Sequence, residues 1–278
     1  MRTREPNAVL VFVLVLSLAA CDTSVDPFQE SGRHFSVGGV IDATVDTQFV
    51  RLTPLRHSAE GDSSPLDAEV TTTDLATGET SVWHDSLFSL IPSGPAHNVW
   101  SSFDFEPGHS YHFTARASDG RESNALVVLP DTFPDLTIQI PPFSSTATIN
   151  VTGVEKLADL RMIFCGRVQG GNITSVDVPL IRRTPRFNLG FTVRVEAFEE
   201  ARRVGQEQVL WIRILAMAAG PAWPDFEESD EKTMALPDAY SNVANGVGFL
   251  GGLTSRLAYW PGFVTPVDDA CYDLIRRW

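Results

Sequence analysis

Four glycines near the end of the sequence form the pattern that most suggests chemistry. Gly246, Gly248 and Gly251 make a literal GxGxxG, and Gly252 follows directly. A dinucleotide site needs this turn between a strand and a helix, within further βαβ units. The flanking residues here have the pattern of strands, and no parallel sheet is predicted. We therefore expect the glycines to be structural, in a bulged or tightly turned β segment, and we expect no cofactor.

Other residue types that carry chemistry are present without the spacing that chemistry requires. The closest histidines, His109 and His112, fall on a turn and a strand, so their side chains should point to opposite faces. The sequence has no HExxH, GxSxG or Walker pattern. The acidic run at 225–231 lacks the alternating ligands and central glycine of a calcium loop. We expect solvent-facing imidazoles, no metal site, a solvated acidic helix face and no enzymatic activity.

The cysteines divide into one near the N-terminus and two further along the chain. These are Cys21, Cys165 and Cys271. Outside the cytoplasm, Cys165 and Cys271 could form a disulfide. Cys165 also lies in an apolar strand pattern, where a free cysteine packs as a small core residue. The sequence leaves both interpretations open.

The N-terminal segment has the features of a signal peptide. Arg2 and Arg4 precede an apolar run over 8–20. A run of this length is too short to span a bilayer, which needs about 20 residues. It ends in Leu18-Ala19-Ala20-Cys21, which resembles a bacterial lipobox. The resemblance implies removal of residues 1–20, lipid attachment at Cys21, a tether over 21–33 and anchoring in the cell envelope, with the outer membrane expected.

The charge balance limits the partners of this chain. Acidic residues outnumber Lys and Arg by 35 to 21, which gives a formal net charge of −14. Such a field repels phosphate backbones and anionic lipid headgroups. We expect no nucleic-acid partner, and contact with the membrane through the lipid anchor only.

Alternation of apolar and polar residues dominates the rest of the chain, which indicates strands. The clearest case is 187–197, where apolar residues occupy every second position. The pattern predicts a mostly β fold, with second-half strands over 135–140, 146–152, 159–168, 173–180, 187–197 and 208–217. A short helix is expected at 221–231, where an early proline and acidic residues favour a helix start.

One segment has a more specific signature. In 105–117, Tyr111 follows the turn at Pro107-Gly108. This arrangement resembles the tyrosine corner of immunoglobulin-like and fibronectin-III sandwiches, where the hydroxyl bonds back to the backbone. The resemblance implies a β-sandwich over 34–130 and places Phe113, Ala115 and Ala117 inward. Residues 131–278 would then form a second, β-rich domain with the one short helix.

Three stretches together resemble a known family. After the lipobox come FSVGGVI at 35–41 and FVRL at 49–52, and SNVANGVGFLGG stands at 241–252. These resemble an uncharacterised lipoprotein family of Bacteroidota and their relatives, a domain of unknown function often encoded beside TonB-dependent outer-membrane receptors. The resemblance implies an envelope accessory protein and supplies no catalytic residues.

The leading hypothesis is therefore a non-enzymatic cell-envelope lipoprotein that partners a TonB-dependent receptor. A surface adhesion or structural module of β-sandwich domains is the alternative. A hydrolase whose site is assembled from distant residues ranks third. The ligand is not indicated by the sequence.

Overall fold

Strands account for nearly all the regular structure, as the sequence predicts. The structure is a computed structural model, and it describes residues 32–55, 64–90, 94–142, 144, 146–168, 170–180, 186–187, 190–224 and 240–261. Within these residues the fold consists of three β-sheets and one short helix. The predicted fold class, mostly β with one short helix, is confirmed.

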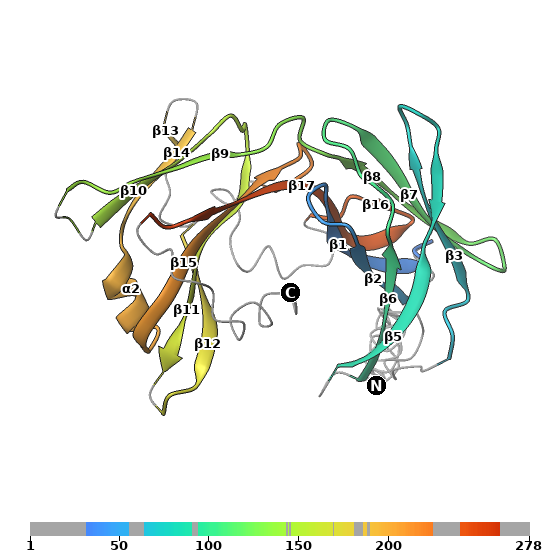
Figure 1. Cartoon of the computed structure of the whole chain (residues 1–278). Coiled ribbons are helices and arrows are strands. Elements are labelled where there is room, and N and C mark those ends of the chain that lie inside the picture. Colours follow the sequence, from blue (N-terminus) through green and yellow to red (C-terminus); the bar gives the residue numbers. More distant parts are fainter. Residues whose placement is uncertain are drawn as a thin grey trace, which may run out of the picture.

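The largest sheet joins the two halves of the chain (Figure 1). In spatial order its eight strands are β12 (Ile173–Pro179), β11 (Leu157–Val168), β15 (Gln206–Ala219), β17 (Gly246–Tyr259), β1 (Phe35–Asp42), β2 (Gln48–Pro54), β6 (Gly94–Ser101) and β5 (His84–Leu90). At its centre β17 pairs in parallel with β1 and antiparallel with β15. The parallel pairing of the first strand with the last was not predicted.

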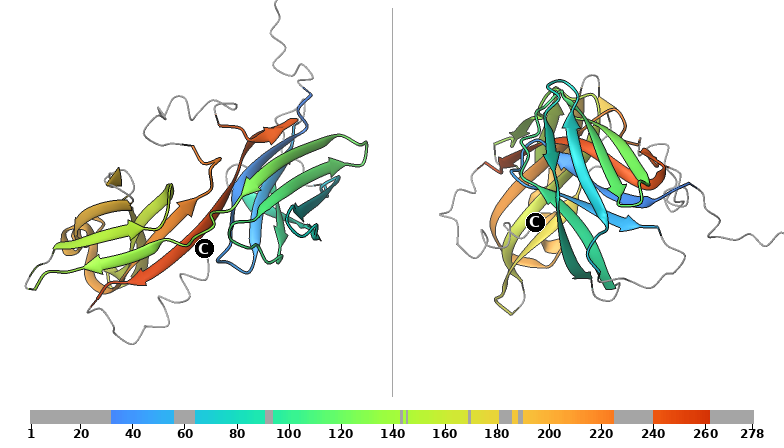
Figure 2. Two further views of the ribbon diagram at one scale, coloured as in Figure 1. Left: turned by 90° about the horizontal axis from the view of Figure 1, so that it is seen from above. Right: turned by 90° about the vertical axis from the view of Figure 1, so that its right-hand side faces the viewer.

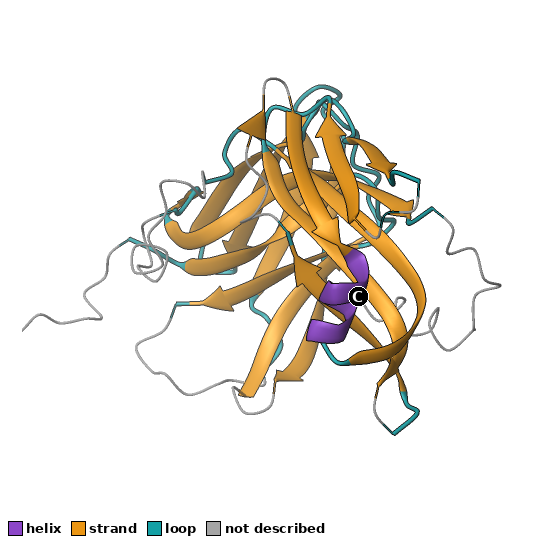
Figure 3. Cartoon of the chain, turned by 90° about the vertical axis from the view of Figure 1, so that its left-hand side faces the viewer, coloured by secondary structure: helices purple, strands orange, loops and turns teal. Residues whose placement is uncertain are grey.

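Two smaller sheets each cover one half of this large sheet, on opposite outer sides of the molecule (Figures 2 and 3). The first is a five-stranded sheet with the order β16 (Val243–Ala244), β8 (Glu122–Val128), β7 (Ser110–Ala117), β3 (Ala68–Asp74) and β4 (Thr80–Val82). The second is a four-stranded sheet with the order β13 (Arg186–Phe187), β14 (Gly190–Glu196), β10 (Thr146–Thr152) and β9 (Asp135–Gln139).

Each pair of facing sheets encloses a hydrophobic core. The first core contains Tyr111, Phe113 and Trp83, and β17 contributes Leu250 to it. The second core contains Met162, Phe164, Ile212 and other apolar residues of β10, β11, β14 and β15. Phe113, Ala115 and Ala117 are buried, as predicted. The boundary predicted at residue 130 stays a prediction, but the strand pairing shows that β16 and β17 return to the first half.

The helix that the structure describes was not predicted, and most of the predicted helix lies where the structure gives no description. Residues 221–224 form a turn, and the rest of the predicted helix at 221–231 lies outside the described residues. The observed helix is α2 (Ala197–Arg203), directly after β14. Its acidic first turn and basic last turn favour a helix, and Ala197 and Ala201 bury one face. Gly205, with φ of 81°, follows its end.

Among the described residues, no helix is long and apolar enough to cross a bilayer.

Candidate functional site: two aspartate–histidine pairs and an open sheet face

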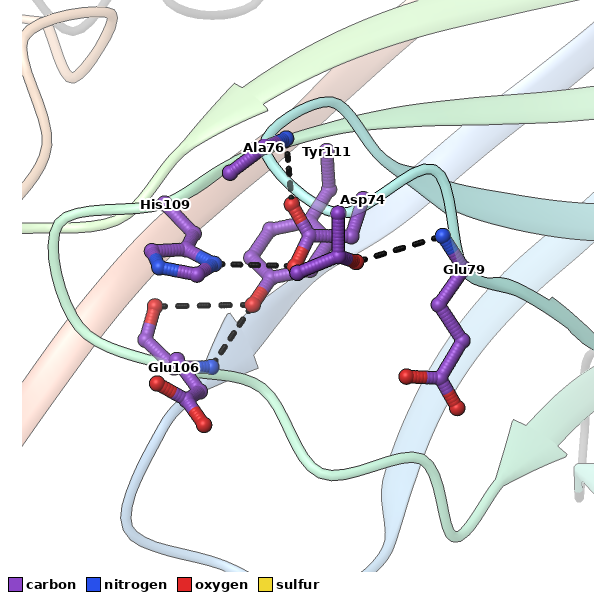
Figure 4. A network of polar contacts seen from close by, with 7 residues as sticks. Asp74, Ala76, Glu79, Glu106, His109 and Tyr111 are labelled. Carbon is purple, nitrogen blue, oxygen red and sulfur yellow. Dashed lines mark hydrogen bonds and ion pairs between the residues drawn. The ribbon is translucent and has the colours of Figure 1, made fainter.

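Asp74 is the centre of a polar network at one end of the first sandwich (Figure 4). It is the last residue of β3, and its side chain is 5% exposed. His109 Nδ1 lies 2.8 Å from Asp74 Oδ2, and the backbone N–H of Ala76 donates to Asp74 Oδ1 at 2.7 Å. The carboxylate therefore links the turn after β3 to the residue before β7.

The hydrogen bonds decide the charge state of Asp74. Burial acts to raise its pKa, but hydrogen bonds from His109 and Ala76 and attraction to His109 outweigh burial. The pKa is lowered from 3.8 as a result. A carboxyl group kept ionised and occupied by its own turn is suited to holding structure.

Tyr111 makes the hydrogen bond that defines a tyrosine corner. The backbone N–H of Glu106 donates to the Tyr111 hydroxyl at 2.6 Å. The ring is fully buried and contacts Phe105 edge-on, with ring centroids 4.8 Å apart. Burial is the main cause that raises the pKa of Tyr111 to about 12. The residue closes the sandwich at its end.

His97 forms the second aspartate–histidine pair and corrects one prediction. We expected solvent-facing imidazoles, but His97 is 5% exposed. Its position on β6 puts it on the same face as the core residue Val99, and its Nδ1 lies 2.9 Å from Asp85 Oδ1 on the neighbouring strand. Nε2 of His97 is buried without a hydrogen-bond partner among the described residues. The expectation failed because strand alternation, rather than residue type, decided which way this ring points.

The GxGxxG glycines all lie inside β17, which continues as a strand to Tyr259. Gly248 has φ of 106°, and a Cβ there would collide with the carbonyl oxygen of Val37 on β1. At Gly251 a Cβ would lie 2.5 Å from the ring of Trp223. These glycines therefore allow the backbone of β1 and the indole of Trp223 to approach β17 closely.

The three cysteines fall differently with respect to the described residues. Cys165 is fully buried beside Trp211 and is disulfide-bonded. Cys21 and Cys271 both lie outside the described residues. The pairing of Cys165 with Cys271 therefore stays a prediction, as does lipid attachment at Cys21.

Metal chemistry has no candidate in the described part of the chain. No group of three or more His, Cys, Asp or Glu side chains is placed there to hold an ion. The acidic run at 225–231 lies outside the described residues.

The face of the large sheet turned away from both cores is the surface that sequence reasoning missed. Leu250 of β17 and Trp260, the residue after β17, belong to the two cores, so odd-numbered positions such as Phe249 and Leu257 lie on the opposite face. Leu253, also on that face, is buried in a small cluster of its own. Because the smaller sheets cover the outer sides, the two halves of this second face turn toward each other beneath β17 (Figure 1). On the half formed by β11 and β15 this face is buried at Cys165, Trp211 and Arg213, whereas on the half formed by β2, β6 and β5 it is open.

Nine residues of three adjacent strands form what we call the open patch. By register they share the open face, and they are Phe49, Arg51 and Thr53 on β2, Ala96, Asn98 and Trp100 on β6, and His84, Ser86 and Phe88 on β5. Phe49 is 52% exposed and Phe88 is 43% exposed, whereas Ala96, opposite Phe88, is 4% exposed. The alternation in 48–53 could have indicated Phe49, but the alignment of three strands required the structure.

Comparisons with known proteins found only distant structural similarity. No protein-family model matches the chain, and no curated protein sequence does. Two crystal structures of pullulanase from Anoxybacillus sp. LM18-11 are distantly similar. The maltotriose complex is 12% identical with a TM-score of 0.24, and the other structure is 11% identical with a TM-score of 0.23. Each match covers 66% of this chain and 24% of the pullulanase chain, so the chain spans about a quarter of that length.

Proposed function

We propose that this chain is a non-enzymatic, lipid-anchored binding protein of the cell envelope. The observation that carries the proposal is the segment Leu18-Ala19-Ala20-Cys21 after a short apolar run with arginines before it. Lipid on Cys21 would hold the protein at the membrane, and several acyl chains together anchor far more firmly than one.

The geometry of the described residues supports binding rather than catalysis. Asp74 and His109 are engaged with the turns at the end of the first sandwich, and Asp85 occupies the Nδ1 of His97. A broad sheet face, by contrast, displays aromatic side chains to solvent. A rigid β scaffold that presents an exposed face is suited to recognising a partner.

The anchor is tested by following the full chain in a Gram-negative host supplied with a labelled fatty acid. We expect the label on the wild type and its recovery with membranes, and we expect Cys21→Ala to lose both. Ser24→Ala, three residues on, is the matched control and should keep both. A Cys21→Ala protein that stays labelled and membrane-bound would contradict the proposal.

We further propose that a TonB-dependent outer-membrane receptor is the partner. Crosslinking in native membranes, followed by affinity capture and mass spectrometry, should recover such a receptor with the wild type above the Cys21→Ala background. Recovery of no receptor would favour the alternative, an adhesion or structural module.

A further inference from the structure

An aromatic row crosses the open patch. Phe49, Trp100 and His84 stand directly opposite one another on β2, β6 and β5. The Trp100 and His84 rings have centroids 4.8 Å apart. Val40 of β1, 38% exposed, follows Gly39, which pairs with Val50, and it extends the row onto β1. Four strands at about 4.8 Å spacing make this row about 14 Å long.

A polar row runs parallel to the aromatic row, two residues away from it along each strand. Arg51, Asn98 and Ser86 are opposite one another across the same three strands. Among the described residues, none of these three side chains has a hydrogen-bond or ion-pair partner. Polar side chains of a folded protein usually form hydrogen bonds within the chain or to water. Because these three form none within the described chain, all their hydrogen-bond donors and acceptors are available to a ligand.

Arg51 differs in this respect from several other exposed arginines. Arg116, Arg121 and Arg203 each pair with a nearby carboxylate. The nine residues of the open patch include Arg51 and His84 but no carboxylate. On the adjacent strand, the Asp42 carboxylate accepts hydrogen bonds from the backbone and hydroxyl of Thr44. The chain as a whole has a net charge of −14, but this patch has an arginine and no carboxylate. The patch is therefore complementary to a ligand that carries negative charge.

We propose that the open patch binds an acidic polysaccharide, a ligand class that deepens the binding function proposed above and rests on it. The aromatic row would stack on the C–H faces of sugar rings, which carry partial positive charge toward the π-face. Arg51 would form paired hydrogen bonds to a uronic acid carboxylate, and Asn98 and Ser86 would bond to hydroxyls.

The shape of the molecule favours a linear chain over the other occupants of such a face. The half of the large sheet that carries the open patch turns toward the other half beneath β17, so a flat bilayer does not match this surface (Figure 1). A neutral glycan would leave Arg51 without a partner. Duplex nucleic acid carries about one negative charge per 1.7 Å of its axis, so the repulsion from a protein of net charge −14 disfavours it most strongly.

The proposal is tested by calorimetric titration of the detergent-extracted full chain with oligogalacturonate and oligomannuronate. Cello-oligosaccharides of equal length are the neutral comparison, and phosphatidylglycerol vesicles are the membrane comparison. We expect binding of at least one acidic oligosaccharide, a change in tryptophan fluorescence, and at least tenfold weaker binding of the neutral one. Arg51→Ala and Trp100→Ala should each weaken acidic binding at least tenfold.

Two control variants carry the same chemistry elsewhere on the surface. Arg121→Ala and Phe133→Ala remove an exposed arginine and an exposed phenylalanine outside the patch, and both should bind like the wild type. Failure of both acidic probes, equal binding of the neutral probe, binding of vesicles instead, or full binding by Arg51→Ala would overturn the proposal. The lipid-anchoring assay is independent of this titration, so either proposal can fail while the other stands.

Discussion

At the scale of single residues, buried polar groups at the end of the first sandwich are satisfied within the chain. Asp74 is fixed by the backbone of Ala76 and by His109, and the Tyr111 hydroxyl is fixed by the backbone of Glu106. Removing one partner of such a bond leaves the other buried and unpaired, which costs more than the bond itself contributes.

Asp74 should make stability depend on acid pH. Its pKa is lower in the folded protein than the ordinary 3.8, so its contribution is present above that value and is lost as the pH falls through the folded pKa. Urea unfolding at pH 7 and at pH 3 should therefore show a smaller drop in stability for Asp74→Asn than for the wild type. An equal drop in both proteins would contradict this role.

Tyr111→Phe isolates the hydroxyl, because the buried ring is retained. We expect a loss of about 1–3 kcal/mol in the free energy of unfolding, since the Glu106 N–H loses its acceptor. The raised pKa of about 12 also predicts that wild-type stability falls as the pH rises from about 10 through 12. Urea unfolding across this range should show less of that fall in Tyr111→Phe.

At the scale of elements, the seam between β1 and β17 depends on glycines for close backbone approach. Gly248 combines a positive φ with a position against the Val37 carbonyl. Gly38, on the facing strand, has open space where a Cβ would be. These two positions lie next to each other in the seam, but we expect an added side chain to destabilise the protein at Gly248 only.

Gly248→Ala should lower the free energy of unfolding by at least about 2 kcal/mol, because strain and a backbone collision add. Gly38→Ala is the matched control and should change stability by less than about 0.5 kcal/mol. Thermal and urea unfolding of the two variants give the comparison. Equal stabilities would show that the seam adapts without cost.

At the scale of the whole molecule, the last strands complete the first sandwich. Leu250 is fully buried in the first core, and the Ser123 hydroxyl donates to the carbonyl of Asn245 at 2.5 Å. The edge of β1 that pairs with β17 would be exposed in a shorter chain. The first half of the chain therefore depends on residues more than a hundred positions away.

A fragment of residues 32–130 should accordingly lack a cooperative unfolding transition, whereas residues 32–278 should unfold cooperatively. Near-ultraviolet circular dichroism and urea titration distinguish the two outcomes. A fragment as stable as the longer chain would show that the domain predicted over 34–130 folds independently of β17.

Local patterns in the sequence were sufficient for several parts of this protein. Alternation over 146–152 and 159–168 predicts β10 and β11 closely, because side-chain direction in a strand follows from chain geometry alone. Tyr111 could be assigned because its hydroxyl bonds to Glu106, only five residues away. Such features depend on neighbours in sequence.

The tertiary structure alone decided which strands meet. β1 pairs with β17, and Phe49, Trp100 and His84 align across three strands. Alternation assigns each residue to one of two faces, but it does not say which distant strand will pair with it or in what register. That choice rests on long-range packing, such as Leu250 filling the first core. The mostly β class could therefore be predicted from the sequence, while the open patch existed only once distant strands had paired.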